Sequence, residues 1–278
     1  MIQSAAIIAV ILIALNAIFS FQGFKKESFM DRFDFHIDPI LKRKEFYRLI
    51  SSGFLHVSWV HLGMNMLALY FFTQALVIET GIIPYFVIYF ASLIGGNLLA
   101  LFLRNNHGDY RAVGASGAVS GLVFAFIALG VGDGIQLIFI PVPIPGWIFG
   151  VIYVAYSIYG IKSRKDNIGH EAHLGGGIVG MIVMVLFQPN LIIENYLTIG
   201  LMLIPTVVFL VLIVKKPNLL LINKKIRGEK PKESIDHQFN ANKLSKEKEL
   251  DHLLDKIGLK GIDSLSKKEK MRLEELSK

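Results

Sequence analysis

Long apolar runs in series constrain the fold of this chain more than any other feature of its sequence. Stretches of roughly 20 mostly apolar residues, the length that crosses a bilayer as a helix, recur from the N-terminus to Val214. Within each run the apolar residues are contiguous, whereas the strands of a lipid β-barrel alternate between apolar and polar positions. We therefore predict an all-α fold and a polytopic membrane protein embedded in a lipid bilayer.

Seven runs are predicted to form helices, and they divide the chain. The first, Ala5–Phe21, has no basic segment before it, so we interpret it as a retained transmembrane helix, with a cleaved signal peptide as the alternative. Residues 1–190 are predicted to form a six-helix core. Residues 191–214 are predicted to form a seventh transmembrane helix, although Glu194, Asn195 and Pro205 interrupt the run and leave its crossing open. The remaining runs are Leu49–Ile78, Ile82–Leu103, Ser116–Val131, Trp147–Ile161 and Ile168–Phe187.

The segment after the seventh run is polar and basic. Residues 215–278 hold 17 Lys and Arg and 11 Asp and Glu, so they carry +6 of the net charge of +7. Because the basic excess is confined to this segment, we expect no nucleic-acid partner for the membrane core. We interpret 215–246 as a linker and 247–278 as a small helical tail domain, with a capping box at Ser266–Glu269. We expect this tail to dock an unknown partner or to regulate the protein.

Polar side chains in the second run are unusual for a membrane helix. His56, His61 and Asn65 lie in its first half, and His61 and Asn65 are four residues apart, which places them on one helix face. Polar groups at this depth indicate a functional site by default. They are also common as hydrogen-bonding groups between membrane helices. For these residues alone both interpretations stay open.

A serine and a histidine in two later runs could form a nucleophile and its base. Ser116 lies between small residues in Gly114–Gly117, and His173 begins a glycine-rich face in the sixth run. A serine hydroxyl needs a neighbouring base, and histidine can accept and return its proton. The chain has no cysteine, which excludes thiol nucleophiles and disulfides. No carboxylate is obvious in a membrane run, so we predict a Ser–His dyad, with His61 and Asn65 able to donate to an oxyanion.

Three motifs in this order closely resemble the rhomboid family of intramembrane serine proteases. They are HxxxN at His61–Asn65, GxSG at Gly114–Gly117, and AHxxGxxxG at Ala172–Gly180. Each is weak alone, but the ordered triple on the second, fourth and sixth runs is specific. The resemblance covers about residues 1–190. The tail looks like a small domain that follows some bacterial rhomboids.

The resemblance implies a six-helix core with a water-filled cavity. It assigns Ser116 as nucleophile, His173 as base, His61 and Asn65 as oxyanion donors, and His56 as structural. It makes Gln22–Arg48 a first loop that lies partly in the membrane, and it makes the loop Lys162–Gly169 a cap over the site.

The chain departs from the family's usual pattern at two places. Many members carry an aromatic residue four positions after the serine, which packs on the catalytic histidine, and this chain has Ser120 there. The resemblance therefore does not say what orients His173. The first-loop Trp-Arg pair of many members is Tyr47-Arg48 here, a milder change.

The sequence therefore predicts an intramembrane serine endopeptidase that hydrolyses transmembrane protein substrates, with no cofactor and no metal. One alternative is a catalytically inactive rhomboid fold that binds membrane clients, although such relatives usually lack the serine or the histidine. A second alternative is a metal-dependent hydrolase in which four histidines bind the metal: His56, His61, His170 and His173. His170 and His173 are three residues apart, unlike the two histidines of the HExxH zinc motif.

Two arguments about the orientation of the chain across the membrane disagree. If all seven runs span, then the first loop, the Ser116 end and the tail share one side, which also holds all 12 Lys and Arg outside the tail. Positive-inside bias would make that side cytoplasmic. The resemblance places the Ser116 end outside, and we adopt this for the site while the side of the tail stays open. We expect a multi-pass protein of the cell (inner) membrane.

Overall fold

The computed structural model describes residues 2–130, 134–136, 142–163, 168–215, 249–258 and 261–276. Its contacts divide the chain into two compact units, Met1–Lys230 and Pro231–Lys278. The predicted linker, except for Lys215, and residues 164–167 of the loop after Lys162 lie outside the described residues.

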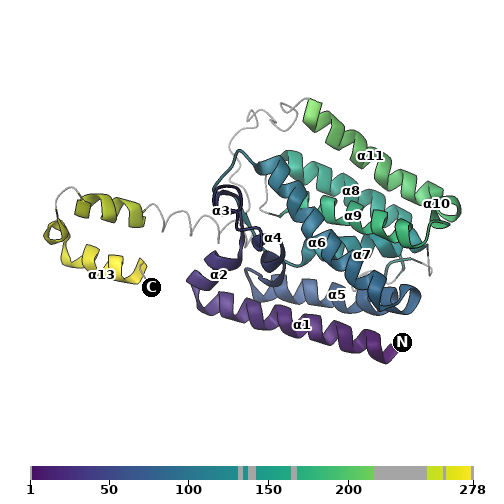
Figure 1. Ribbon diagram of the computed structural model, residues 1–278, viewed down its shortest axis with the longest axis horizontal. Helices are drawn as coiled ribbons and strands as arrows, with labels where there is room; N and C mark the ends of the chain where they lie inside the picture. The colour runs from purple at the N-terminus through teal and green to yellow at the C-terminus, as the bar shows by residue number, and fades with distance from the viewer. Residues whose placement is uncertain are drawn as a thin grey trace. The chain divides into compact units, whose positions relative to one another are not determined.

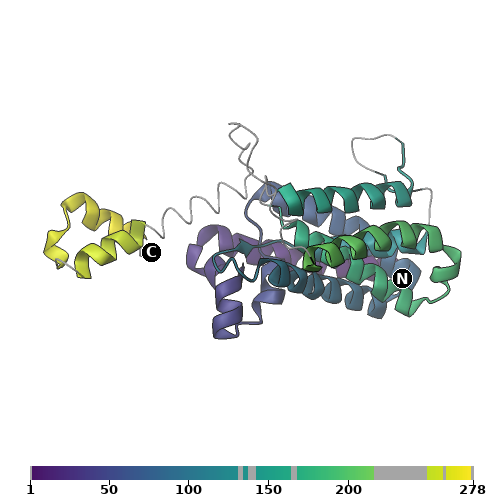
Figure 2. The same cartoon turned by 90° about the horizontal axis from the view of Figure 1, so that it is seen from above.

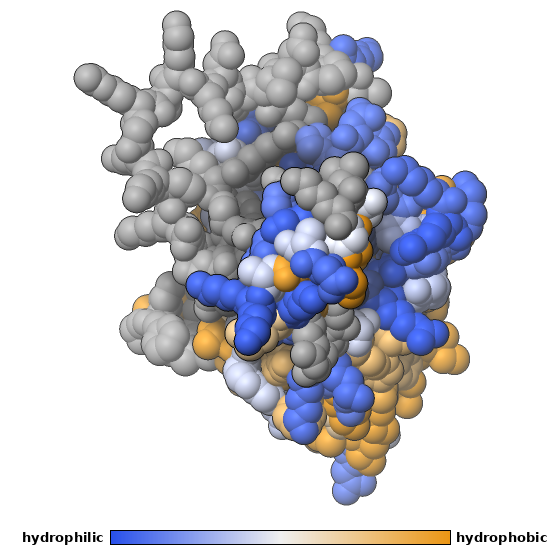
Figure 3. Space-filling model, turned by 90° about the vertical axis from the view of Figure 1, so that its left-hand side faces the viewer, coloured by the Kyte–Doolittle hydropathy of each residue, from blue (hydrophilic) through white to orange (hydrophobic). Residues whose placement is uncertain are grey.

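Among the described residues of the first unit, seven long helices run alongside one another (Figures 1 and 2). They are α1 (Ile2–Lys25), α5 (Trp59–Thr80), α6 (Ile82–Arg104), α7 (Ser116–Leu129), α8 (Gly146–Ser163), α9 (His170–Phe187) and α11 (Tyr196–Lys215). Among the described helices, α1, α5, α6, α9 and α11 are long and apolar enough to cross a membrane. Exposed apolar residues such as Ile7, Val10 and Ile18 on α1 give the unit an apolar surface, and Figure 3 shows such residues in its lower part. The protein is therefore a mostly helical, polytopic membrane protein, as predicted.

Two predicted helices differ from those observed. The run Leu49–Ile78 is divided into α4 (Arg48–Ser51), the 3-10 helix η1 (Ser52–Phe54) and α5, so His56 lies before its membrane helix. The seventh run is divided into α10 (Leu191–Glu194) and α11 because the chain bends at Asn195. The Asn195 amide donates to the carbonyl oxygens of Ala128 and Leu129, at 3.1 and 3.3 Å, and so satisfies the C-terminus of α7.

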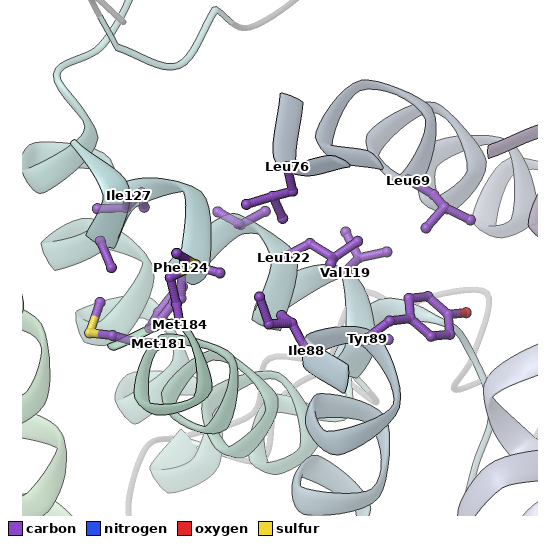
Figure 4. Packing of buried hydrophobic residues seen from close by; sticks show 14 of the residues in the cluster. Leu69, Leu76, Ile88, Tyr89, Val119, Leu122, Phe124, Ile127, Met181 and Met184 are labelled. Atoms are coloured by element: carbon purple, nitrogen blue, oxygen red, sulfur yellow. The ribbon is translucent and has the colours of Figure 1, made fainter. Parts of the chain in front are cut away.

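The short helix α7 lies at the centre of this unit. Every residue of α7 is buried except Ser116 and Phe126. In Figure 4 its side chains, among them Leu122 and Phe124, point toward residues of α5, α6 and α9 such as Leu76, Ile88 and Met181. A helix that is almost entirely apolar is covered by neighbours on all sides, whereas Ser116, its first residue, lies at the end of the helix and is partly exposed.

Glycines allow α7 and α9 to pack with their backbones in contact. A Cβ on Gly176 would lie 2.8 Å from the carbonyl carbon of Gly117, and one on Gly180 would lie 2.6 Å from that of Gly121. Any side chain at these positions would push the two helices apart. Gly176 and Gly180 thus form a GxxxG pattern that lets the two helices approach closely, and this approach sets the distance between the residues at the start of each helix.

The first loop is a folded element. It contains α2 (Glu27–Phe33), β1 (Phe35–His36) and α3 (Ile37–Arg43), and β1 pairs antiparallel with β2 (Arg111–Ala112). This two-residue pair is a small departure from an all-α fold. The buried Arg48 side chain bonds Asp34 Oδ1 at 2.7 Å and Glu45 Oε2 at 2.6 Å, and it also donates to two backbone carbonyls. These bonds connect segments of the loop to one another, and Arg111 of β2, which leads into Gly114, is 3.1 Å from Asp31 Oδ1 and from Asp34 Oδ2 and so holds the loop against the strand.

His36 is part of this loop and lies near three cations. Its burial, together with the positive charges of Arg111, Arg48 and Arg43, outweighs the effect of Asp38 and lowers the pKa of His36 to about 4. The side chain is therefore neutral near pH 7, when an ordinary histidine already begins to take up a proton.

The helix α11 returns from the end of the unit where α10 lies to the end where α2, α3 and α4 lie (Figure 1). If α11 spans the membrane, its last residue emerges on the same side as the first loop.

The second unit is a small helical hairpin. A helix over 249–258 is followed by the 3-10 helix η3 (Ile262–Ser264) and by α13 (Lys267–Leu276), and Leu253 and Leu265 are its buried residues. The predicted capping box is present: the Ser266 N–H donates to the Glu269 carboxylate at 2.8 Å, and the Glu269 N–H donates to Ser266 Oγ at 3.3 Å.

Candidate active site

The hydroxyl of Ser116 and the imidazole of His173 meet where α7 and α9 begin. The distance between Ser116 Oγ and His173 Nε2 is 2.6 Å, which is a short hydrogen bond. Ser116 is the first residue of α7, and His173 lies in the first turn of α9. Both residues are partly exposed.

A glycine in an unusual backbone conformation places Ser116 at the helix start. Gly114 has φ of +133°, a region that residues with a side chain rarely adopt. Its N–H donates to the carbonyl of Ser52 at 3.0 Å, so the turn is tied to η1. A Cβ on Gly114 would lie 3.0 Å from Cε1 and from Nε2 of His61. The glycine therefore allows the turn and also brings the His61 ring next to it.

His61 and Asn65 lie on the first turns of α5. Ser58 caps this helix by accepting from the His61 N–H at 3.1 Å. The His61 ring lies against Gly114, two residues before Ser116, whereas the Asn65 amide donates to the carbonyl of His61 at 3.0 Å. The structure thus brings His61 to the Ser116 turn directly. Asn65 is one helical turn behind His61 and is bonded to its own helix.

His56 accepts a hydrogen bond from the turn that precedes Ser116. The N–H of Ala115 donates to His56 Nε2 at 3.4 Å, so the ring proton is on Nδ1 and donates to Ser20 Oγ at 2.9 Å. The Ser20 hydroxyl in turn donates to the carbonyl of Phe54 at 3.1 Å. Burial, together with the neighbouring His61, lowers the pKa of His56 to about 3, which keeps the ring neutral and able to accept. This is the structural position expected for His56.

The carboxylate of Glu171, two residues before His173, is bonded away from the site. It forms an ion pair with Arg104 at the end of α6, with nitrogen–oxygen distances of 2.5 and 2.7 Å. Glu171 is 1% exposed, so this pair fastens the start of α9 to α6 inside the protein. This bond joins Oε1 of Glu171 to Arg104 rather than to His173.

One residue beside His173 was missed from the sequence. Tyr153 of α8 has its ring centroid 6.5 Å from that of His173, and its hydroxyl is 2.5 Å from Ser120 Oγ. A signal for it was available: Gly150, Val154 and Ser157 are the buried residues of its face, and Tyr153 falls at helical spacing among them.

The four histidines of the metal hypothesis do not gather into one site. Within the part of the chain that the structure describes, no group of three or more His, Asp or Glu side chains could hold a metal ion. Of the four, His56 is used in the bonds to Ser20 and Ala115, and His173 in the bond to Ser116.

Comparisons with known proteins identify the domain in which these residues lie. The model of the rhomboid domain matches residues 43–190, just over half of the chain, and 233–278 match a family of unknown function, DUF6576. The chain is 35% identical over 137 residues to yeast "Rhomboid protein 1, mitochondrial", covering 48% of this chain and 40% of that protein.

Two similar proteins come from Arabidopsis thaliana. "RHOMBOID-like protein 12, mitochondrial" is 29% identical over 180 residues, 57% of this chain and 51% of its own length. "RHOMBOID-like protein 4" is 35% identical over 168 residues, 55% of this chain and 38% of its own. The matches thus span about half or less of the curated relatives. Since the rhomboid domain covers the helices that bring Ser116, His173 and His61 together, the chain belongs to the rhomboid family.

Proposed function

We propose that this chain is an intramembrane serine endopeptidase that hydrolyses peptide bonds in transmembrane protein substrates. The observation that carries the proposal is the 2.6 Å contact between Ser116 Oγ and His173 Nε2, because a serine hydroxyl becomes a useful nucleophile only with a base in hydrogen-bond reach. Membership of the rhomboid family supports it, since the family is typically one of intramembrane serine proteases.

The proposed reaction follows from the positions of these groups. His173 takes the proton of Ser116 as Oγ attacks the carbonyl carbon of the scissile bond. The same imidazole then gives the proton to the leaving amine. Water releases the acyl group from Ser116 in a second step.

Donors for the oxyanion would come from two elements. The N–H of Ser116 is one of the first N–H groups of α7, which have no partner within the helix. His61, whose ring lies against Gly114, would supply a second donor. Asn65 would supply a third through an amide hydrogen other than the one given to the His61 carbonyl.

The length of α7 supports cleavage within the membrane. Its 14 residues span about 21 Å at 1.5 Å per residue, less than the roughly 30 Å of a bilayer's hydrocarbon core. Ser116 would therefore lie below the membrane surface. A substrate helix would have to unwind near its end to present an extended peptide there, and a water-filled cavity would have to supply the water for hydrolysis.

The proposal also includes the membrane in which the protein lies, which we infer from the tail. We propose the cell (inner) membrane of a bacterium, because the tail resembles a domain that follows some bacterial rhomboids. Fractionation of the source cells would test this, and recovery in an organelle would contradict it. The two relatives "Rhomboid protein 1, mitochondrial" and "RHOMBOID-like protein 12, mitochondrial" carry organellar names.

The proposal is tested by reconstituting the full chain with a labelled transmembrane substrate. We expect cleavage and covalent labelling by a fluorophosphonate, with both lost in Ser116→Ala and cleavage lost in His173→Ala. Ser28→Ala and His107→Ala, which change exposed residues, are the matched controls. Cleavage that survives in Ser116→Ala would exclude the serine mechanism, and loss with a chelator would favour a metal. Neither cleavage nor labelling in the wild type would favour an inactive client-binding scaffold.

A further inference from the structure

A chain of hydroxyl groups connects α8 to the backbone of Ser116. Ser120 Oγ is 2.7 Å from the carbonyl oxygen of Ser116, which can only accept, so the Ser120 hydroxyl donates to it. Ser120 Oγ is also 2.5 Å from the hydroxyl of Tyr153. Because the Ser120 proton is already given away, Tyr153 is the donor in the second bond. Two bonds in series thus join Tyr153 to the first turn of α7.

The ring of Tyr153 contacts the other half of the pair. Its centroid is 6.5 Å from that of His173 with an angle of 40° between the planes, within the range of attractive aromatic pairs. The ring is itself held by Phe124 of α7, at 5.4 Å and 76°, and by Phe149 of α8, at 6.1 Å. The ring of this side chain therefore pairs with the base, and its hydroxyl is connected through Ser120 to the backbone carbonyl of the nucleophile.

The small side chain at position 120 makes this arrangement possible. Ser120 is 2% exposed and faces α8, so a larger residue there would occupy the space into which Tyr153 reaches. The hydroxyl of Ser120 instead leaves this space open and accepts a hydrogen bond from the hydroxyl of Tyr153. Positions 120 and 153 are thus complementary. Helix α8 supplies the ring of Tyr153, and α7 supplies the space beside Ser120 and the hydroxyl that accepts the hydrogen bond.

We propose that Tyr153 is a positioning residue for the Ser116–His173 pair, in place of the aromatic residue that many rhomboids carry four positions after the serine. This inference rests on the proposed function. The ring limits the orientations of the His173 imidazole, and the hydroxyl chain fixes the first turn of α7. The base and the nucleophile are then held at bonding distance before substrate arrives.

Variants of Tyr153 separate the ring from the hydroxyl. In the reconstituted full chain, the rate of fluorophosphonate labelling and the kcat and KM of cleavage are measured from pH 5 to 9. We expect Tyr153→Ala to lower the labelling rate and kcat by about 10- to 100-fold and to change KM by less than about twofold. Tyr153→Phe keeps the ring and should lose only about 2- to 10-fold.

A relocated ring and a matched control test the positioning role directly. The double variant Ser120→Tyr/Tyr153→Ala returns an aromatic residue to α7, and we expect it to label faster than Tyr153→Ala. Tyr159→Ala removes an exposed tyrosine from the same helix and should leave all rates unchanged. The pH profile of Tyr153→Ala should be displaced from that of the wild type because the surroundings of His173 change, which loss of stability alone would not produce.

The outcomes distinguish the two proposals. A wild type that neither labels nor cleaves overturns the proposed function, and the positioning role with it. A wild type that labels while Tyr153→Ala labels equally fast overturns only the positioning role. Equal losses in Tyr153→Phe and Tyr153→Ala, with an unchanged pH profile, would also overturn the role of the ring.

Discussion

Replacing Gly176 by alanine should separate the proposed dyad without touching either of its residues. Gly176 lies one turn after His173 on α9, and its Cα faces the backbone of Gly117, the residue after Ser116. An added methyl group would therefore act on the two helices at the point closest to the Ser116–His173 contact.

The size of the effect follows from the contact distances. A Cβ on Gly176 would lie 2.8 Å from the carbonyl carbon of Gly117, where an ordinary van der Waals contact begins at 3.4 Å. The carbonyl oxygen of Gly117 would lie nearer still. The helices must therefore separate by more than about 0.6 Å, because the obstacle is backbone and cannot rotate away. Added to the 2.6 Å between Ser116 Oγ and His173 Nε2, this opening leaves a long and weak hydrogen bond. We expect a loss of about 10- to 100-fold in labelling and cleavage rates, and a loss of about 1–3 kcal/mol in stability.

Substitutions of two further glycines are the controls that distinguish helix separation near Ser116 from a general loss of stability. Gly180→Ala meets the backbone of Gly121 at 2.6 Å, one turn farther from Ser116, so it should lose similar stability but less activity. Gly200→Ala in α11 has only an ordinary contact, to Ile204 at 3.8 Å, and should gain up to about 1 kcal/mol from helix propensity. Activity and unfolding in SDS are measured for all three. Wild-type labelling by Gly176→Ala would refute the argument that helix separation sets the geometry of the site.

Other regions of the protein give three further predictions. Glu171→Gln breaks a buried ion pair with Arg104 and should lower the free energy of unfolding by about 3 kcal/mol. Asp38→Asn breaks an exposed pair and should lower it by less than about 1 kcal/mol. Equal losses in the two variants would contradict the stabilising role of the buried pair. Because the pKa of His36 is lowered to about 4 in the folded chain and is near 6.5 when unfolded, its contribution to stability is complete above pH 6.5 and is lost as the pH falls toward 4. Unfolding measured against pH should show this loss in the wild type and not in His36→Asn. Since the chain has no cysteine, Glu79→Cys at the turn between α5 and α6 and Lys268→Cys in the tail can be labelled singly with an impermeant maleimide. If α11 spans, only one of the two should react from a given side, and equal reaction of both would show that it does not.

The parts of the fold that could be predicted are those in which hydrophobicity alone decides. The seven apolar runs correspond to the seven long helices, because a bilayer gives a run of that length one stable form. The start of α5 was placed too early because the run is apolar through Phe54 and Leu55, although Ser58 caps the helix at its observed start. The break at Asn195 was visible as a polar interruption, but its reason, the capping of α7, required the tertiary structure.

The pair Ser116–His173 could be anticipated because Ser116 precedes Gly117 and His173 lies one turn before Gly176, and these glycines determine a close helix approach. Gly117 and Gly176 bring α7 and α9 together, and this leaves the residues at the two helix starts facing each other. Tyr153 could not be found in the same way, because α8 meets α7 and α9 through side chains rather than through a backbone contact that a motif records. A serine at position 120 looks like a missing aromatic residue when the chain is examined one helix at a time. Its hydroxyl bonds to both Ser116 and Tyr153 identify it as one half of a contact between two helices. The absence of an expected side chain at one position was therefore a reason to look for its replacement on a neighbouring helix.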